Sequence, residues 1–364
     1  MELFWHRRDL RLADNVGLAA AADRSEVAGV FVFDDDVLAH ASDVRVRRLL
    51  DGLAALRADY RDRGSDLLVA RGDPETVLPG LADALGADRV VWNRDYSGLA
   101  RERDAAVRRA LNDAGVEREA HHDAVLHTPD SIRTNAGDPY SVYTYYWRKW
   151  TDRETDPPAP TPESGDLVDD DVLAASLGSD DGAIADGGTE TDRIAVGNLP
   201  APSNLGFAEP EAEVGPAGTE AARRRLDAFL DEAVFAYDAE RDYPAREATS
   251  RMSAFLKYGE IGVREAYEAT ERALDAAAER AGGGPESEES GDGADDADDG
   301  GPVAAVEEYQ QQLAWREFYT QVLYHNPEVV TENYKEYEEG IAWRDDPEEI
   351  AAWKRGETGY PIVD

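Results

Sequence analysis

Residues 1–120 alternate short apolar runs with longer amphipathic stretches, and this alternation restricts the fold more than any other feature of the sequence. The apolar runs are rich in Val, Leu and aromatic side chains and are short enough for buried strands. They cover residues 2–6, 27–34, 66–70 and 88–93. Helical patterns cover residues 15–23, 44–63, 75–85 and 99–114. Because strands that alternate with helices form a parallel sheet covered on both faces, residues 1–130 are predicted to form an α/β domain with a doubly wound parallel sheet.

Ligands of such a sheet bind at the carboxyl ends of its strands. The sequence has no Gly-rich phosphate loop of the GxGxxG, GxxxxGKS or GxxxxGKT type, which argues against a nicotinamide or ATP site. The absence of cysteine excludes disulfides, thiolate metal ligands and cysteine nucleophiles. The histidines lack the spacing of a metal site, so no metal is predicted.

The second half of the chain has a different character. Pro, Gly, Asp, Ser and Thr dominate from residue 151, and residues 131–220 are predicted to form an interdomain linker. Helical periodicity resumes at Ala221 and no strand pattern follows, so residues 221–364 are predicted to form an all-α domain. Within it, the acidic low-complexity segment 282–302 is predicted to be a disordered insertion, and a long helix is predicted at 303–325.

The chain carries 78 Asp and Glu against 38 Lys and Arg, a formal net charge of −40. Such a charge normally steers a protein away from nucleic acid. Here the acidity is spread along the chain, as is typical of proteins from salt-saturated cytoplasm, where the Debye length falls to ~3 Å near 1 M salt. Under that screening a local basic patch can still bind an anion, so the net charge does not decide the partner. With no membrane-length apolar run and no secretory signal, the sequence predicts a cytoplasmic protein without a membrane partner.

A run of hydroxyl side chains precedes a short apolar segment at residues 249–258. Thr249 or Ser250 is suited to the N-cap of a short helix, and Gly259 to the position just after its end. Hydroxyls and free N–H groups at a helix start can also bind an anion such as a diphosphate. Ordinary capping is the commoner explanation, and this stretch alone leaves both interpretations open.

In the predicted helix 303–325, Gln312, Trp315, Arg316 and Tyr319 are spaced at i, i+3, i+4 and i+7 and are expected to share one face. Their amide, indole, guanidinium and phenol groups suit a planar ligand that forms hydrogen bonds, such as a base stacked on Trp315 with its edge read by Gln312. An aromatic stripe at a domain interface is the alternative.

Several stretches resemble the DNA photolyase and cryptochrome family, in the family's order and from one end of the chain to the other. They are LFWHRRDLRLADNVGL at 3–18, TSRMSAFLKYGEIG at 249–262, QLAWREFY at 312–319, IAW at 341–343 and WKRGETGYPIVD at 353–364. The resemblance is closest to microbial class I cyclobutane pyrimidine dimer photolyases of haloarchaeal type. It implies an N-terminal α/β antenna domain and a C-terminal all-helical domain that holds FAD. These two fold classes agree with those predicted from the hydrophobic periodicity.

The resemblance also implies roles for individual residues. FAD contacts are implied for Tyr237, Thr249, Ser250, Arg251, Met252 and Ser253, and for Gln312, Leu313, Ala314, Trp315, Arg316, Glu317, Phe318 and Tyr319. Antenna contacts are implied for Arg8 and Lys257. Trp315 corresponds to the indole on which the flipped dimer stacks, and Trp343 to the outermost member of a tryptophan chain for electron transfer.

The implied activity is a carbon–carbon lyase reaction driven by light. Reduced FAD absorbs blue light, directly or through 8-hydroxydeazaflavin or 5,10-methenyltetrahydrofolate as antenna. It passes an electron to a pyrimidine dimer flipped out of UV-damaged DNA, and the electron returns after the ring splits. A monomer is expected.

Two departures from the family keep alternatives open. Gln312 stands where many dimer-specific members have glutamate; it keeps the reach but loses the negative charge. A cryptochrome-type photoreceptor without repair is therefore the first alternative. The sequence ends at Asp364, where the family continues with further helices. The expectation is thus an incomplete FAD domain, and an inactive truncated product is the second alternative.

Overall fold

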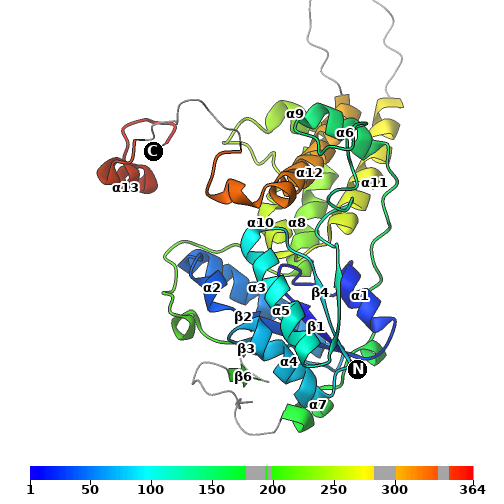
Figure 1. Ribbon diagram of the computed structural model, residues 1–364. Coiled ribbons are helices and arrows are strands. Elements are labelled where there is room, and N and C mark those ends of the chain that lie inside the picture. Colours follow the sequence, from blue (N-terminus) through cyan, green and yellow to red (C-terminus); the bar gives the residue numbers. More distant parts are fainter. Residues whose placement is uncertain (178–192, 196–198, 283–300, 335–343, 364) are drawn as a thin grey trace, which may run out of the picture. The chain divides into compact units, whose positions relative to one another are not determined.

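The computed structural model describes residues 1–177, 193–195, 199–282, 301–334 and 344–363 (Figure 1). Strands form at the predicted apolar runs, and two further strands join them. Every side chain of the first two strands is buried, as is usual for a parallel sheet covered on both faces. The strands are β1 (Glu2–His6), β2 (Val27–Phe33), β3 (Leu68–Arg71), β4 (Arg89–Asn93), β5 (Glu117–His121) and β6 (Arg193–Ala195).

Helices follow the amphipathic stretches and fill most of the second half of the described chain. They are α1 (Val16–Ala22), α2 (Asp35–Leu38), α3 (Asp43–Arg61), α4 (Pro74–Leu85), α5 (Gly98–Asp113), α6 (Tyr143–Thr151), α7 (Asp170–Leu177), α8 (Thr219–Asp231), α9 (Tyr237–Glu240), α10 (Ser253–Tyr258), α11 (Val263–Gly282), α12 (Gly301–His325) and α13 (Pro347–Arg355). Short 3-10 helices are η1 (Ser164–Asp166), η2 (Pro202–Leu205), η3 (Ala233–Ala236) and η4 (Pro327–Val330).

The sheet has the strand order β5-β4-β1-β2-β3-β6. Strands β1 to β5 are parallel, and β6 pairs antiparallel with β3. The chain starts in the middle at β1, adds β2 and β3 on one side, and then returns to add β4 and β5 on the other. The strand order therefore reverses between β1 and β4, and this switch point is where open α/β sheets bind ligands.

Side chains alternate across the sheet and build two cores. Leu3 and Trp5 of β1 pack with α4, α5 and α7 on one face. Phe4 points to the other face and packs with α1 and α3. This alternation is the normal period of a strand, and it accounts for the doubly wound arrangement that the sequence predicted.

The described chain divides into two units, Met1–Pro327 and Glu328–Asp364. In the first unit, α6, α8, α11 and α12 lie together beyond the carboxyl end of the sheet (Figure 1). Three apolar clusters hold these helices, and one of them joins α6 to α12 through buried aromatic rings. In the second unit, Asp346 caps α13 by accepting hydrogen bonds from the backbone N–H groups of Glu348 and Glu349.

Most strand and helix predictions for the first half are confirmed to within a few residues, and the exceptions have physical causes. Strand β5 (sequence EREAH) was missed because its side chains are exposed or half-buried and carry no apolar run. Strand β6 and helices α6 and α7 lie in the predicted linker 131–220. The predicted domain boundaries stay a prediction. Of the predicted insertion 282–302, residues 283–300 lie outside the described residues, and α12 begins at Gly301.

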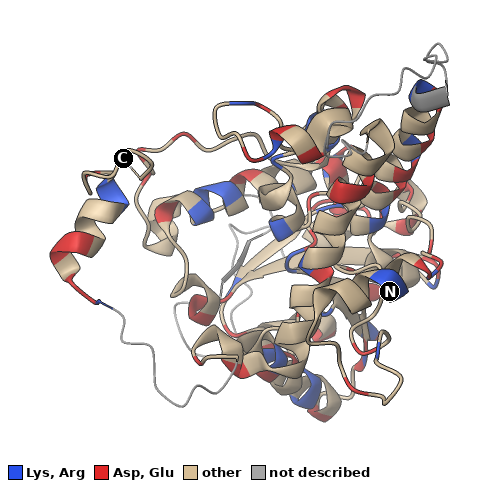
Figure 2. Ribbon diagram, turned by 90° about the horizontal axis from the view of Figure 1, so that it is seen from above, with Lys and Arg blue, Asp and Glu red and all other residues tan. Residues whose placement is uncertain are grey.

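No strand occurs after residue 221 in the described part of the chain, as the all-α prediction requires. Asp and Glu recur along most helices in Figure 2, as the spread of acidic residues in the sequence indicated. None of the helices in the described ranges combines the length and the apolar composition needed to cross a bilayer.

Candidate functional site

A cavity of about 420 Å³ lies between α10 and α12, and we call it the α10–α12 cavity. Its volume is in the usual range for pockets that enclose a small molecule, roughly 300–1,000 Å³. The lining combines cations, hydroxyls, one amide and a few apolar side chains. It consists of Arg8, Tyr237, Ser250, Met252, Ser253, Leu256, Lys257, Tyr309, Gln312, Leu313 and Arg316.

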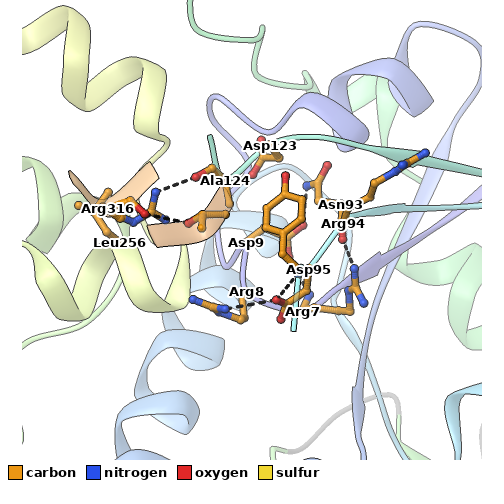
Figure 3. Close-up of a pocket in the computed structure, with 12 residues that line it drawn as sticks. Arg7, Arg8, Asp9, Asn93, Arg94, Asp95, Asp123, Ala124, Leu256 and Arg316 are labelled. Atoms are coloured by element: carbon orange, nitrogen blue, oxygen red, sulfur yellow. Dashed lines mark hydrogen bonds and ion pairs between the residues drawn. The ribbon is translucent and has the colours of Figure 1, made fainter. Parts of the chain in front are cut away.

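A second, smaller cavity of about 50 Å³ lies at the switch point of the sheet, and we call it the β1–β4 cavity (Figure 3). Its walls come mainly from the residues that end or follow β1 and β4. They are Arg7, Arg8, Asp9, Asn93, Arg94, Asp95, Tyr96, Asp123, Ala124, Leu256, Arg316 and Thr320. Arg8, Leu256 and Arg316 line both cavities, so the two sites adjoin each other through these three side chains.

The loop before α10 differs from the predicted cap. Helix α10 begins at Ser253 with Met252 at the N-cap and no capping side chain, so the assignment of Thr249 or Ser250 as N-cap is wrong. The reason is the backbone of Arg251, whose φ of 52° is left-handed and turns the chain before the helix starts. The predicted role of Gly259 is confirmed, because it ends α10 with a φ of 65°.

This turn decides which hydroxyls reach the α10–α12 cavity. Ser250 and Ser253 line it, whereas Thr249 and Arg251 do not. Arg225 fixes the turn from outside by donating hydrogen bonds to the carbonyl oxygens of Thr249 and Ser250 at 2.8 and 2.9 Å. Because α10 has only six residues, its dipole is a weak basis for anion binding.

The positive charge for anion binding comes from cationic side chains and not from the dipole of α10. Arg8, Lys257 and Arg316 line the α10–α12 cavity, and none of the described residues in its lining is acidic. Arg8 pairs with Asp95 at 3.5 Å, while Lys257 and Arg316 form no ion pair with any described residue. The charge of Arg8, together with burial, lowers the pKa of Lys257. In a chain with a net charge of −40, such an excess of positive charge in a cavity is suited to an anionic ligand.

The predicted common face of α12 is divided between two environments. Gln312 and Arg316 line the α10–α12 cavity. Trp315 stacks instead on Tyr143 of α6, with ring centroids 3.6 Å apart and an interplanar angle of 11°. Tyr319, which is 62% exposed, stacks on the same indole at 5.5 Å. Consecutive residues of a helix are about 100° apart around its axis, so Trp315 and Arg316 face different neighbours.

The remaining side chains of segment 312–319 also lie in different surroundings. Leu313 lines the cavity, whereas Ala314 and Phe318 pack in the aromatic cluster with α6. The buried carboxylate of Glu317 accepts hydrogen bonds from the backbone N–H groups of Leu126 and His127, at 2.8 and 3.0 Å. Ala314, Glu317 and Phe318, for which the family resemblance implied FAD contacts, therefore lie away from both cavities.

Burial of Glu317 leads to a pH prediction. Burial raises the pKa of this carboxyl from its ordinary 4.5 to about 7. The two backbone N–H groups and the charge of Arg316 lower the pKa, but burial has the larger effect. Between these two pH values the folded chain holds a proton that the unfolded chain has lost, so the free energy of unfolding falls as the pH rises. We expect the wild type to lose up to about 1.4 kcal/mol per pH unit in this window relative to Glu317→Gln.

Urea unfolding of both proteins at pH 4.5, 5.5, 6.5 and 7.5 checks this slope. The other titrating groups are common to both proteins and cancel in the difference. A constant difference across these pH values would contradict the raised pKa.

Sequence reasoning missed Tyr309, whose ring lies 5.3 Å from that of Tyr237 in the cavity wall. Burial raises its pKa to about 12, so the phenol stays protonated. The sequence spacing could have identified Tyr309 as a cavity residue. Tyr309, Gln312, Leu313 and Arg316 are spaced at i, i+3, i+4 and i+7 and therefore share one face of α12. Trp343, the predicted electron-transfer residue, lies outside the described residues.

The residues of the α10–α12 cavity fit FAD. Three cations and two serine hydroxyls can hold a diphosphate, and Met252, Leu256 and Leu313 give apolar surface for an aromatic ring system. The lining contains no carboxylate among the described residues that would repel the phosphates.

Comparisons with known proteins give matches at both ends of the chain. The family described as DNA photolyase matches residues 2–163, and the FAD binding domain of DNA photolyase matches residues 309–364. A deoxyribodipyrimidine photo-lyase of Halobacterium salinarum is 54% identical over 375 residues, covering 100% of this chain and 70% of that protein.

Two solved structures are similar over the whole chain. A class III photolyase from Agrobacterium tumefaciens has a TM-score of 0.76 at 28% identity, and 67% of its chain is covered. An archaeal photolyase from Sulfolobus tokodaii, solved with two FAD molecules, has a TM-score of 0.72 at 26% identity, and 69% of its chain is covered. With an α/β sheet matched at one end, an FAD-binding segment matched at the other and a 54% identical relative along its full length, this chain belongs to the DNA photolyase family.

Proposed function

We propose that this chain repairs cyclobutane pyrimidine dimers in DNA with light, using FAD bound in the α10–α12 cavity. The observation that carries the proposal is the excess of positive charge in a cavity of ligand size, set in a strongly acidic member of the photolyase family. FAD, when bound in its reduced form, supplies the light-excited electron that splits the dimer. The protein provides binding, orientation and exclusion of water.

Different residues of the cavity would bind the diphosphate, exclude water and contact the pyrimidine. Ser250 and Ser253 donate hydrogen bonds, and Arg8, Lys257 and Arg316 supply charge, for the diphosphate. Met252, Leu256 and Leu313 exclude water, which lowers the local dielectric constant and strengthens each electrostatic contact. Gln312 presents its amide to the pyrimidine. We retain Tyr237 as a cofactor contact because it lines the same cavity.

Trp315 keeps its proposed role as the platform for the flipped dimer, but Tyr143 now covers one face of the indole. A base that stacks on this face must displace Tyr143. We expect Tyr143→Ala to strengthen dark binding of a dimer-containing oligonucleotide about fivefold, because base–aromatic stacking contributes roughly 1–3 kcal/mol and would no longer compete with the tyrosine. Fluorescence anisotropy measures this change.

Tyr145→Ala is the control, since Tyr145 is an exposed tyrosine of the same helix. Thermal unfolding of both variants separates a binding effect from loss of the buried Tyr143 ring. Equal or weaker binding by a folded Tyr143→Ala protein would count against Trp315 as the platform.

The β1–β4 cavity is the proposed position for part of an antenna pigment. It lies at the switch point of the sheet and shares Arg8, Leu256 and Arg316 with the α10–α12 cavity, so a pigment there would adjoin the flavin. Its volume of about 50 Å³ holds only a fragment of a pigment. We favour 8-hydroxydeazaflavin over 5,10-methenyltetrahydrofolate, with Arg8, which lines both cavities, as a contact. Lys257, for which the resemblance implied an antenna contact, lines only the α10–α12 cavity. Reconstitution with each pigment, followed by absorbance of the protein after gel filtration, decides between them.

A direct test of repair uses an oligonucleotide with one thymine dimer. We expect the dimer to disappear under blue light in the presence of FAD-loaded, chemically reduced protein, and to persist in the dark. Persistence of the dimer under light, while the flavin is bound and photoreduced, would reject the repair proposal.

The second candidate is a cryptochrome-type photoreceptor. Two observations favour it: Gln312 in place of glutamate, and the indole face of Trp315 covered by Tyr143. Flavin photoreduction without loss of dimers is the result that this candidate predicts. A monomeric state and a cytoplasmic location stay predictions of the sequence.

A further inference from the structure

The side-chain amide of Gln312 is held in one orientation by Glu308, which lies one helical turn earlier on α12. The amide nitrogen Nε2 of Gln312 donates to the carboxylate oxygen Oε1 of Glu308 at 3.2 Å, and to the backbone carbonyl oxygen of Glu308 at 3.4 Å. Both partners are acceptors. Rotating the amide by half a turn would place its oxygen against the carboxylate, so the orientation with nitrogen toward Glu308 is the only favourable one.

Neighbouring side chains fix Glu308 in turn. Arg241 donates from its guanidinium to Oε1 of Glu308 at 2.5 Å, and Gln311 donates from its amide to Oε2 at 3.1 Å. The Arg241 guanidinium also lies over the ring of Tyr237 at 5.6 Å. Charge-assisted hydrogen bonds of this kind are short and directional, so the carboxylate has little freedom to turn away from Gln312.

The consequence is that the carbonyl oxygen Oε1 of Gln312 is the atom left for a ligand. Gln312 lines the α10–α12 cavity, and no donor from the described residues reaches this oxygen. A glutamine in isolation offers a donor and an acceptor and discriminates poorly between ligand groups. Glu308 turns it into a residue that only accepts.

We propose that Glu308 is a positioning residue that sets specificity: by orienting Gln312, it makes the cavity select a ligand group that donates a hydrogen bond, namely the imide N3–H of a pyrimidine in the lesion. This inference rests on the proposed function, because it takes a pyrimidine dimer as the ligand of Gln312. It also explains how the amide of Gln312 can replace a carboxylate at this position. Glu308 supplies a negative charge one helical turn earlier, and Oε1 of Gln312 remains directed at the ligand as the acceptor.

The test measures dark binding of the FAD-loaded full chain at one salt concentration. The probes are three oligonucleotides of one sequence, carrying a thymine dimer, the same dimer methylated at N3, or undamaged thymines. We expect the wild type to bind the methylated dimer about tenfold more weakly than the unmodified one, because the carbonyl oxygen of Gln312 loses its donor. In Glu308→Gln the side chain at 308 can donate as well as accept, so only the backbone carbonyl contact at 3.4 Å still favours one orientation of Gln312. This difference should then shrink to about twofold.

Two further variants sharpen the result. Glu307→Gln makes the same change of charge at an exposed neighbour on the same helix, and it should keep the tenfold difference. In the double variant Glu308→Gln/Gln312→Glu, a carboxylate at 312 is an acceptor without help from its neighbour, so the difference should return.

The outcomes separate the two proposals. If Glu308→Gln keeps the tenfold difference, methylation acts through bulk alone and the inference is overturned. It is overturned as well if the wild type binds both dimers equally tightly while still preferring them to undamaged DNA. If the wild type does not distinguish the unmodified dimer from undamaged DNA, the proposed function itself fails. Circular dichroism of each variant confirms that it is folded.

Discussion

Replacing Arg316 with methionine should weaken FAD binding at least tenfold. The Arg316 guanidinium lines the α10–α12 cavity and forms no ion pair with any described residue, and it donates to the carbonyl oxygen of Ala124 at 2.7 Å. Burial and the neighbouring charge of Arg8 lower its pKa, which means that the folded chain holds this cation at a cost. A charge-assisted hydrogen bond to an anionic ligand contributes roughly 1.5–3 kcal/mol, or about ten- to a hundredfold in affinity.

Titration of the flavin-free protein with FAD, followed by the change in flavin fluorescence, gives the affinity. Arg101→Met is the matched control. Arg101 also donates to a backbone carbonyl, that of Tyr324 at 3.0 Å, but it lies outside both cavities. Arg101→Met should therefore bind FAD as the wild type does. If both variants retain wild-type affinity, Arg316 does not contact the flavin, and the α10–α12 cavity loses its main support as the cofactor site.

The largest effect on stability is expected for Gly259→Ala, at about 2 to 5 kcal/mol. Gly259 ends α10 with a left-handed φ of 65°, which costs an alanine roughly 1–2 kcal/mol. A Cβ at this position would also lie 2.0 Å from the backbone carbonyl oxygen of Arg8. Backbone atoms cannot turn aside as a side chain does, and overpacking of this kind costs a further 1–3 kcal/mol or so.

Gly86→Ala is the control for backbone strain alone. Gly86 ends α4 with a nearly identical φ of 64°, and an added Cβ would meet nothing within 4 Å. It should lose only about 1 to 2 kcal/mol. Urea unfolding of both variants at one salt concentration gives the difference between their free energies of unfolding. This difference measures the cost of crowding between α10 and the loop after β1. Equal losses in the two variants would show that this approach is absent or easily relaxed.

This close approach also matters for the candidate site. Arg8 donates from Nε to the carbonyl oxygen of Lys257 at 3.1 Å, and Arg11 donates to that of Gly259 at 3.0 Å. The end of α10 is thus fastened to the loop that carries Arg8. Displacing this contact in Gly259→Ala should therefore weaken flavin binding too, even where the variant still folds.

The sequence by itself determined strands β1 to β4, the flanking helices α1, α3, α4 and α5, and the long helix α12. These elements follow from local periodicity, because a strand or helix with one or two buried faces must repeat its apolar residues at a fixed spacing. Ser250, Ser253, Gln312 and Arg316 could also be singled out, since hydroxyl, amide and guanidinium groups beside apolar runs are unusual in a core.

Only the tertiary structure decided how these residues meet. Strand β5 has no apolar signature, and it is a strand because β4 offers it a partner. The left-handed turn at Arg251, the stacking of Trp315 on Tyr143 and the convergence of Arg8 with Lys257 all depend on contacts between segments far apart in the chain. The same holds for the pairing of Glu308 with Arg241, which orients Gln312. Spacing along one helix shows which residues can share a face, but the neighbour that each one contacts is set by packing between elements, which a local pattern does not contain.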